Sequence, residues 1–325
     1  MVNLGTKYLG LNLKNPLIIS SSGLTNSVEK ISNLEEKGAA AVILKSIFEE
    51  QIRYESNSLD MGSDYPEATD YILNYTKSNN IRNYLDLIEQ SKKVVKIPVI
   101  PSINCMTSNE WVSFAKNLES AGADAVELNI YFLPTDKNTT SAEYESNYLD
   151  VINNVLSEIK IPIAVKLGNG FTNPAYIVNQ LYKYGVKGVV LFNRFYEPDI
   201  DIDNLKLTTA EILSNNSDIR QSLRWIGLIS SMDIKIDIAA STGVHDSEGL
   251  IKMLLAGANS VMICSALYKY GTDHIKKIIK GLEEWMVKKN YNSIDEFRGK
   301  MNYNNIPDPS LYERSQFMKY FSSIQ

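Results

Sequence analysis

The stretch Gly122-Ala123-Asp124-Ala125-Val126-Glu127-Leu128 places a glycine shortly before an apolar run, and the same pattern occurs four times in the chain. The other three segments are Gly38-Ala39-Ala40-Ala41-Val42-Ile43-Leu44, Gly185-Val186-Lys187-Gly188-Val189-Val190-Leu191 and Gly257-Ala258-Asn259-Ser260-Val261-Met262-Ile263. A glycine at such a place supplies the left-handed residue that ends a helix, and a β-branched run is typical of a strand buried on both faces. Each segment therefore predicts a helix end followed by a buried strand.

Apolar strands of a second type lie between these segments, and three of them open with proline. They are Pro16-Leu17-Ile18-Ile19, Pro98-Val99-Ile100, Pro162-Ile163-Ala164-Val165 and Ile236-Asp237-Ile238-Ala239. Proline is tolerated as the first residue of a strand. The two types alternate strictly, which predicts eight strands. Helical patterns fill the gaps, with start signals at Asn26, Thr107 and Asp246.

Eight β–α alternations favour an α/β fold, a closed (β/α)8 TIM barrel, which typically has about 250 residues. An open, doubly wound sheet is the alternative, but the Gly-x-Gly-x-x-Gly turn after the first strand is missing. We expect one domain over residues 1–325. The remaining residues are assigned to an N-terminal hairpin (4–15), a long loop (47–80), a loop at 194–207 and a tail after Glu296, with the inserted loops over the C-terminal face.

Composition excludes several classes of protein. Of 325 residues, 44% are apolar and 22% charged, as in ordinary globular domains, and the net charge of −5 argues against binding to nucleic acid. The two cysteines, Cys105 and Cys264, provide no disulfide framework, and with two histidines they leave little for a zinc site, so we expect no metal. Neither a signal peptide nor an apolar run of roughly 20 residues is evident, which predicts a cytoplasmic protein without a membrane segment.

Polar or small residues follow every predicted strand, at the end where such barrels carry their active sites. Ser241-Thr242-Gly243 and Cys264-Ser265 follow strands seven and eight, the usual phosphate site of the fold. Backbone N–H groups and hydroxyls there can converge on an anion. The alternative interpretation is a glycine turn with a capping serine. His245, just beyond the turn, is interpreted as a loop histidine.

Two lysines end strands two and five. Lys45 and Lys166 would bring an ammonium group to the barrel mouth, where a lysine can form an imine, bind an anion or stabilise a negatively charged cofactor. Alternatively, each extends to the rim and keeps its charge in water. Glu127, inside strand four, is interpreted as a buried carboxylate paired with one of these lysines, with a general base as the less favoured role.

In this order the motifs resemble the dihydroorotate dehydrogenase family of FMN-containing barrels, in particular its soluble first class. The resemblance runs from Asn15-Pro16-Leu17 and Ser22-Gly23 through Leu44-Lys45-Ser46, Glu127-Leu128-Asn129 and Val165-Lys166-Leu167 to Ser241-Thr242-Gly243 and Ile263-Cys264-Ser265. It implies an oxidoreductase of pyrimidine biosynthesis that acts on a CH–CH group, and it implies a homodimer. The implied flavin contacts are Ser22, Gly23, Lys45, Ser46, Asn129, Lys166 and Asn193, with Ser241, Thr242, Gly243, Cys264 and Ser265 at the FMN phosphate. The implied substrate contacts are Lys45, Asn129 and Asn193.

One motif departs from the family. Where members carry Asn-x-Ser-Cys-Pro-Asn, or a version with a serine base, this chain has Asn129-Ile130-Tyr131-Phe132-Leu133-Pro134. Phe132 occupies the position of the base, so Tyr131 is the candidate substitute, with Lys45 and Asn129 as the other catalytic candidates. The prediction is an FMN-dependent enzyme with a small-molecule substrate and a soluble electron acceptor. An FMN-binding relative with another substrate or no turnover, and a phosphosugar aldolase or isomerase, remain as alternatives.

Overall fold

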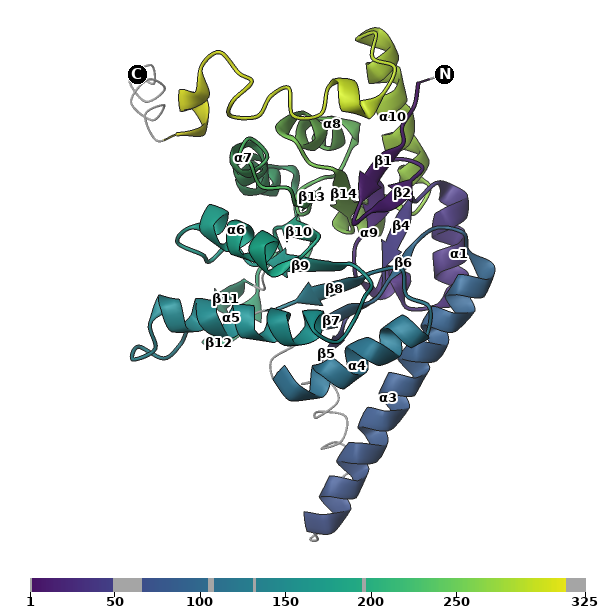
Figure 1. Ribbon diagram of the computed structural model, residues 1–325, viewed down its shortest axis with the longest axis vertical. Helices are drawn as coiled ribbons and strands as arrows, with labels where there is room; N and C mark the ends of the chain where they lie inside the picture. Colours follow the sequence, from purple (N-terminus) through teal and green to yellow (C-terminus); the bar gives the residue numbers. More distant parts are fainter. Residues whose placement is uncertain (1, 49–65, 105–107, 131–132, 195–196, 314–325) are drawn as a thin grey trace.

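The protein is described by a computed structural model, which covers residues 2–48, 66–104, 108–130, 133–194 and 197–313 (Figure 1). Its parallel strands form one continuous sheet. In sheet order they are β5 (Ile47–Phe48), β7 (Ser102–Asn104), β8 (Val126–Asn129), β9 (Ile163–Leu167), β10 (Gly188–Leu191), β13 (Asp237–Ala240), β14 (Ser260–Ile263), β3 (Leu17–Ile19), β4 (Ala41–Ile43) and β6 (Val99–Ile100).

The ends of this sheet belong to the same two barrel strands. β4 and β5 are consecutive pieces of one strand interrupted at residues 44–46, and β6 and β7 are pieces of the next, interrupted at Pro101. β4 pairs with β6 and β5 pairs with β7, so the sheet closes into a barrel of eight strands. This confirms the predicted (β/α)8 barrel and all eight predicted strands. We call the interrupted pieces β4–β7 the broken seam.

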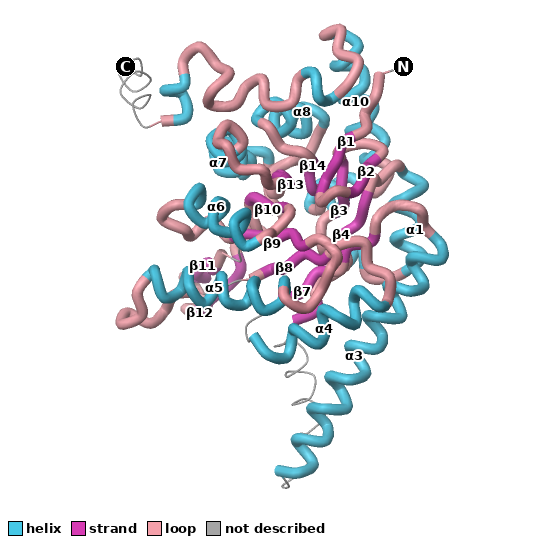
Figure 2. The backbone as a smooth tube through the Cα atoms, viewed as in Figure 1, coloured by secondary structure: helices cyan, strands magenta, loops and turns pink. Residues whose placement is uncertain are grey.

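Helices surround the ring (Figures 1 and 2). They are α1 (Val28–Lys37), α3 (Pro66–Val94), α4 (Ser108–Ser120), α5 (Ser141–Leu156), α6 (Pro174–Tyr184), α7 (Ile219–Ile229), α8 (Ser247–Ala256), α9 (Ser265–Tyr270) and α10 (His274–Lys288), with short 3-10 turns η1 (Gly23–Thr25), η2 (Asn216–Asp218), η3 (Ile294–Glu296) and η4 (Pro309–Tyr312). No helix in the described part of the chain is long and apolar enough to cross a membrane.

The predicted helix boundaries mostly agree with the structure. Gly38, Gly185 and Gly257 cap α1, α6 and α8 in the left-handed conformation, with φ of 113°, 99° and 118°. Asp246 caps α8 as expected, through a bond that Gly249 N–H donates to its side chain. Ser27 rather than Asn26 caps α1, since a serine hydroxyl one residue closer accepts from the Lys30 N–H.

Two predicted loops contain regular structure. The segment 47–80 includes β5 and the first part of α3, which begins at Pro66, so it is not one long loop. Proline is well suited to that position because its fixed φ matches the first helical turn. The segment 194–207 contains most of an antiparallel hairpin, β11 (Pro198–Asp201) and β12 (Lys206–Thr209). Only four residues of each strand pair, so the alternation is too short to predict it from sequence.

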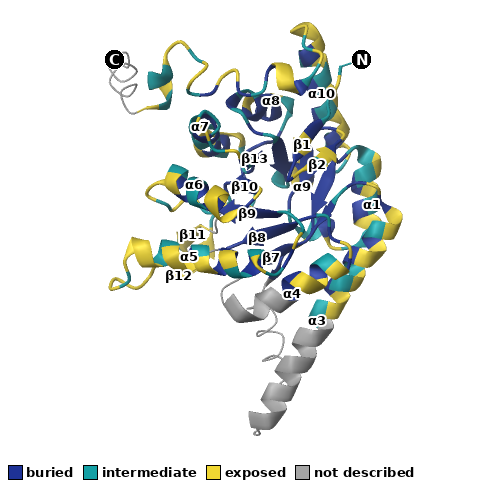
Figure 3. Cartoon of the chain, viewed as in Figure 1, coloured by how far each residue is buried: buried dark blue, intermediate teal, exposed yellow. Residues whose placement is uncertain are grey.

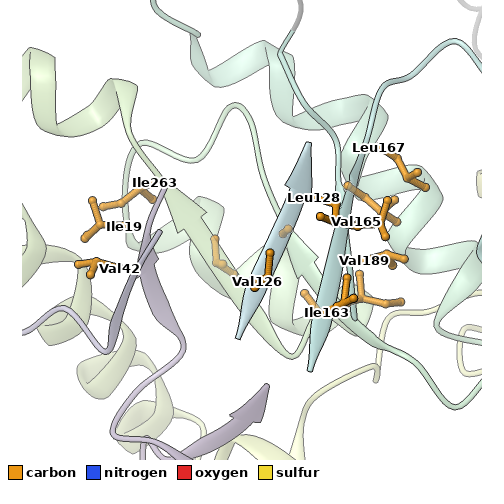
Figure 4. Close-up of a cluster of buried hydrophobic side chains, with 14 of the residues drawn as sticks. Ile19, Val42, Val126, Leu128, Ile163, Val165, Leu167, Val189 and Ile263 are labelled. Atoms are coloured by element: carbon orange, nitrogen blue, oxygen red, sulfur yellow. The ribbon is translucent and has the colours of Figure 1, made fainter. Parts of the chain in front are cut away.

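Side chains on the two faces of the barrel wall form separate cores. The strands of the wall are mostly buried, whereas the helices around them are buried on one side only (Figure 3). The outer core lies between strands and helices, and Figure 4 shows part of it, with Val126 and Leu128 from β8 and Val165 from β9. Because side chains alternate along a strand, the residues next to these in sequence point into the barrel. Ala125, before Val126, and Ala164, before Val165, accordingly belong to the smaller inner core.

The predicted N-terminal hairpin is present as β1 (Thr6–Tyr8) and β2 (Leu11–Leu13), paired antiparallel. Tyr8, Leu9 and Leu13 are buried and pack with the inner core, so the hairpin closes the N-terminal end of the barrel. At Gly188, the first residue of β10, an added Cβ would lie 2.5 Å from Leu9 Cδ2 and 3.2 Å from Tyr8 Cε2. The absence of a side chain at Gly188 is what allows this contact.

We expect Gly188→Ala to lower the free energy of unfolding by about 1–3 kcal/mol, because overpacking a filled core forces side chains from their preferred rotamers. Urea unfolding followed by circular dichroism measures the change. Gly170→Ala is the matched control, since an added Cβ there meets nothing within 4 Å. Equal free energies of unfolding for the two variants would show that the hairpin accommodates the added Cβ without loss of stability.

Candidate functional site

A cavity of about 590 Å³ lies at the C-terminal ends of β9, β10, β13 and β14, within the usual size range of small-molecule sites. More than half of the predicted cofactor residues line it: Lys166, Asn193, Ser241, Thr242, Gly243, Cys264 and Ser265. Residues 209–214, from the last residue of β12 onward, also line it. Sequence positions far apart therefore converge at the end of the barrel where the strand ends predict a site.

Ser46, Ser22 and Gly23 lie next to residues of the cavity wall. Ser46 is hydrogen-bonded to Ser21, a lining residue, and Ser22 is close enough to Cys264 to oppose the rise in the pKa of its thiol that burial causes. A Cβ on Gly23 would come within 3.0 Å of the hydroxyl of Tyr268, another lining residue. Lys45 is exposed at the broken seam. Tyr131 and Phe132, the candidate base and the residue in the family's base position, lie outside the described residues.

Thr242 and Gly243 form a turn that suits an anion. Both have left-handed backbone conformations, with φ of 77° and 82°. Thr242 Oγ1 donates to the Phe192 carbonyl at 2.9 Å, which holds the turn against β10. Among the described residues, the backbone N–H groups of residues 242–244 have no acceptor. Successive N–H groups of this kind make an anion-binding concavity.

Gly243 also has a packing reason to be glycine. A Cβ there would lie 2.2 Å from the backbone nitrogen of Ile219, at the start of α7. Ser265 opens α9 on the opposite side of the cavity, and its Oγ accepts from the Ser214 N–H at 3.1 Å. The glycine turn of the alternative interpretation is present, but its capping serine is not, because Cys264 holds the N-cap position of α9. The N–H groups of the turn remain available to a phosphate.

Lys166 reaches the cavity through strand alternation. It follows the inner-core residue Ala164 by two positions on β9, so it points into the barrel, and it is 7% exposed. Its Cα pairs with that of Asn129 on β8. The Asn129 Oδ1 accepts from the Asn193 Nδ2 at 3.1 Å, and this bond does not use the NH2 group of Asn129 or the Oδ1 of Asn193. Lys166 and the Asn193 amide therefore line one end of the cavity, and Asn129 supports Asn193.

Glu127 lies below this group inside the barrel and is fully buried. Burial raises the pKa of its carboxyl, while the Lys166 ammonium and a hydrogen bond from Ser102 oppose that rise. Ser102 Oγ donates to Glu127 Oε1 at 3.2 Å. The predicted interaction with a lysine is thus with Lys166 and not with Lys45. It acts through the field of the ammonium, because none of the ion pairs within 4.0 Å among the described residues joins Glu127 to Lys166.

A polar cluster that sequence reasoning missed supports the far side of the cavity. Ser214 Oγ lies 3.0 Å from His245 Nε2, and Lys269 Nζ donates to the Ser214 carbonyl at 2.7 Å. His245 lies in a loop, as predicted, but it is only 3% exposed, and burial together with Lys269 lowers its pKa. Ser214 follows an irregular segment without periodicity, so no local signal pointed to it.

Arg194, directly after the predicted site residue Asn193, also lines the cavity. Its guanidinium donates to the Ile212 carbonyl and lies 3.7 Å from the Asp218 carboxylate and 4.0 Å from Glu197. These contacts link the end of β10 to the segment after β12 and to the turn before α7. Its charge is largely matched by carboxylates, so the free cation of the cavity is Lys166 among the described lining residues.

These features fit FMN. The flavin phosphate requires convergent N–H and hydroxyl groups, which Thr242, Gly243 and Ser265 can supply. The isoalloxazine ring requires a mainly apolar slot with a few fixed polar groups, which the amides and Lys166 can provide. A volume of about 590 Å³ is sufficient for such a ligand.

Comparison with known proteins gives one consistent result. The family model described as dihydroorotate dehydrogenase matches residues 3–286. The chain is 26% identical over 306 residues to the dihydroorotate dehydrogenase B (NAD(+)) catalytic subunit of Thermoplasma volcanium, covering 89% of this chain and 93% of that protein. It is 27% identical over 295 residues to the protein of the same name from Endomicrobium trichonymphae, covering 89% and 94%. The Methanocaldococcus jannaschii protein of that name is 25% identical over 301 residues, covering 88% and 94%.

Proposed function

Because this chain belongs to the dihydroorotate dehydrogenase family, we propose that it is an FMN-dependent oxidoreductase acting on the CH–CH group of a small molecule. The observation that carries the proposal is the cavity that joins the N–H turn at Thr242–Gly243 to the buried cation Lys166. A phosphate-bearing cofactor that becomes negatively charged on reduction fits both ends. FMN supplies the hydride acceptor of such a reaction.

The residues of the chain have separable tasks in this proposal. Thr242, Gly243 and Ser265 hold the phosphate and so fix the position of the ring. Lys166 places a positive charge where the reduced cofactor gains negative charge, in a site where the charge is pre-positioned and partly shielded from water. Asn129 and Asn193 orient the substrate or the flavin through the amide groups that their mutual hydrogen bond leaves available. Lys45, at the broken seam, is the candidate for contact with the substrate.

Dihydroorotate is the substrate that the family implies, and Phe132 weakens that assignment because a phenyl ring cannot accept a proton. A related substrate or an FMN-binding protein without turnover therefore remains within the proposal. For assembly we propose a homodimer that passes electrons to a soluble acceptor in the cytoplasm. The relatives' names mention NAD(+) and a catalytic subunit, which supports testing nicotinamide cofactors first.

The visible spectrum of the purified protein tests the proposal most directly. Flavin absorption bands that coelute with the protein, or appear after incubation with FMN, are the expected result. Borohydride trapping of a phosphosugar on Lys45 or Lys166, in a protein that never acquires flavin, would replace the proposal with the aldolase alternative. Light scattering on the same sample gives the oligomeric state.

Replacing Lys166 with alanine is expected to lower the two-electron reduction potential of bound flavin by about 30–60 mV. A charge-assisted hydrogen bond contributes about 1.5–3 kcal/mol, and about 1.4 kcal/mol corresponds to 30 mV for a two-electron couple. Equilibration with reference dyes measures the potential. Lys187→Ala, an exposed lysine just before β10, is the control and should leave it unchanged. An unaltered potential in the Lys166 variant would remove this lysine from the flavin edge.

A further inference from the structure

Three serine hydroxyls connect the cavity with the fully buried Glu127. Ser21 lines the cavity, and its Oγ lies 3.0 Å from Ser46 Oγ. Ser46 Oγ lies 2.8 Å from Ser102 Oγ, which in turn contacts Glu127 Oε1 at 3.2 Å. We call Ser21, Ser46 and Ser102 the serine chain. Ser21 follows β3, Ser46 lies between β4 and β5, and Ser102 is the first residue of β7, so two of the three belong to the broken seam.

Neighbouring groups hold the serine chain in place. The Ser46 N–H donates to Ser21 Oγ at 2.8 Å. The Tyr84 hydroxyl, from α3, accepts from the Ser102 N–H at 3.0 Å and donates to the Ser102 carbonyl at 3.2 Å. Ser102 is fully buried and Ser46 nearly so. The three hydroxyls therefore have few partners except one another, the acid and the cavity.

The hydrogen bonds of the serine chain can run in two directions. When Glu127 is ionised, Ser102 donates to it, Ser46 to Ser102 and Ser21 to Ser46, so each hydroxyl proton is directed toward the barrel interior. When Glu127 carries a proton, the order can reverse, and the Ser21 hydroxyl is then free to donate to a ligand in the cavity. Each serine hydroxyl is both donor and acceptor, which is the property that proton relay requires.

The surroundings of Glu127 favour a proton on it. Its Oε2 has no hydrogen-bond partner, and desolvation is the largest influence and raises its pKa. The charged or titratable groups that face it are Lys166, whose ammonium opposes the rise, and the hydroxyls of Tyr8 and Tyr84. Tyr8 Oη, from the hairpin that closes the barrel, is likewise buried without a partner. Glu127 is thus a carboxyl group with one connected route to the cavity among the described residues.

We propose that Glu127 and the serine chain form a proton path that delivers one proton to the ligand in the cavity and returns it. The proton on Glu127 Oε1 passes to Ser102 Oγ, the Ser102 proton to Ser46, the Ser46 proton to Ser21, and the Ser21 proton to the ligand. Glu127 becomes a carboxylate beside the Lys166 ammonium, the ligand gains one proton, and no electrons move along the path. The path stands on the hydrogen bonds alone, and only the identity of its recipient, a reduced flavin, rests on the proposed function.

Infrared spectroscopy of the protein without cofactor tests the path. The carbonyl stretch of a protonated Glu127 is identified by its loss in Glu127→Gln, and its shift after dilution into D2O gives the rate of exchange with solvent. We expect Ser46→Ala to slow this exchange at least tenfold, and Ser46→Thr, which restores a hydroxyl, to recover most of the rate. Ser91→Ala, another buried serine whose hydroxyl has no partner, is the control and should exchange as the unmodified protein does.

Other outcomes overturn the path. Equal exchange rates in Ser46→Ala and the unmodified protein would show that protons reach Glu127 by another way, and Ser102→Ala repeats the test if Ser46→Ala does not fold. A missing Glu127 carbonyl band at every pH would show that the acid stores no proton. After FMN loading, the band should bleach on flavin reduction in the unmodified protein and persist in Ser46→Ala. Failure to bind flavin would contradict the proposed function. The exchange experiment, which uses the protein without cofactor, would still test the proton path.

Discussion

When the FMN-loaded protein is mixed anaerobically with dihydroorotate, we expect the flavin to bleach slowly. Typical enzymes turn over at about 1–10³ per second, and we expect a rate constant about 10²–10⁴-fold lower. The reaction removes a proton from C5 while hydride leaves C6, and the resemblance to the family motif predicts Phe132 at the position of the base. Pro134 replaces the second asparagine of the motif, so polar edges of the pyrimidine lose partners, at roughly 1–3 kcal/mol for each group. Stopped-flow absorbance measures the bleaching.

Two substitutions separate the possible explanations of slow bleaching. Phe132→Cys restores a group that can accept a proton and should raise the rate by at least tenfold if the missing base limits it. Tyr131→Phe should abolish residual bleaching if the tyrosine acts as a substitute base. Bleaching of the unmodified protein at an ordinary enzymatic rate would contradict the prediction and assign it the family's usual activity. No bleaching in any variant, with flavin bound, would indicate a different substrate.

A carboxylate at the phosphate end of the cavity should expel FMN. We expect Ser265→Asp to weaken FMN binding by roughly 10³-fold. Two like charges about 4 Å apart repel by roughly 4 kcal/mol at an effective dielectric constant of about 20, and each 1.4 kcal/mol changes the affinity tenfold. The helix itself should tolerate the change, because an acidic residue in the first turn interacts favourably with the helix dipole. Fluorescence titration of the apoprotein with FMN gives the affinity.

Riboflavin is the control for this experiment, since it has the same ring and no phosphate, and its affinity should change little. Ser265→Ala removes the contact to the Ser214 N–H without adding charge, and it should weaken FMN binding much less than Ser265→Asp does. A substitution at Gly243 would be less informative, because its Cβ would collide with the start of α7 and perturb the fold as well as the site. Equal losses for FMN and riboflavin in Ser265→Asp would place the phosphate elsewhere.

Local sequence signals were sufficient for the barrel and for part of the site. Each glycine stop is followed within a few residues by a buried strand, so Gly38, Gly185 and Gly257 marked their helix ends without any tertiary information. Strand ends such as Lys166 and Thr242 could be assigned to one cavity because the barrel topology brings all strand ends to the same side. The sequence pattern could therefore predict those features of the site that follow from the barrel topology alone.

Contacts across the barrel could not be predicted in this way. The serine chain joins residues 21, 46, 102 and 127, and each serine alone looks like an ordinary strand end. Whether Glu127 interacts with Lys45 or Lys166 depends on which lysine faces the lumen at the same height, and strand register decides that. Ser214 enters the cavity wall only because Arg194, Lys269 and His245 hold its segment there. These are consequences of three-dimensional packing that no local pattern contains.

The broken seam has a consequence for how the barrel opens. β5 and β7 share two paired residues, and so do β4 and β6, whereas β8–β9 and β9–β10 share four each. Segments with few protecting hydrogen bonds open at low free energy, and amide hydrogen exchange detects such local opening. Amides of Ile47 and Ile103 should therefore exchange faster than those of Val165 and Val189. Exchange that slows at the seam when a ligand is added would show that the ligand stabilises this part of the wall against local opening.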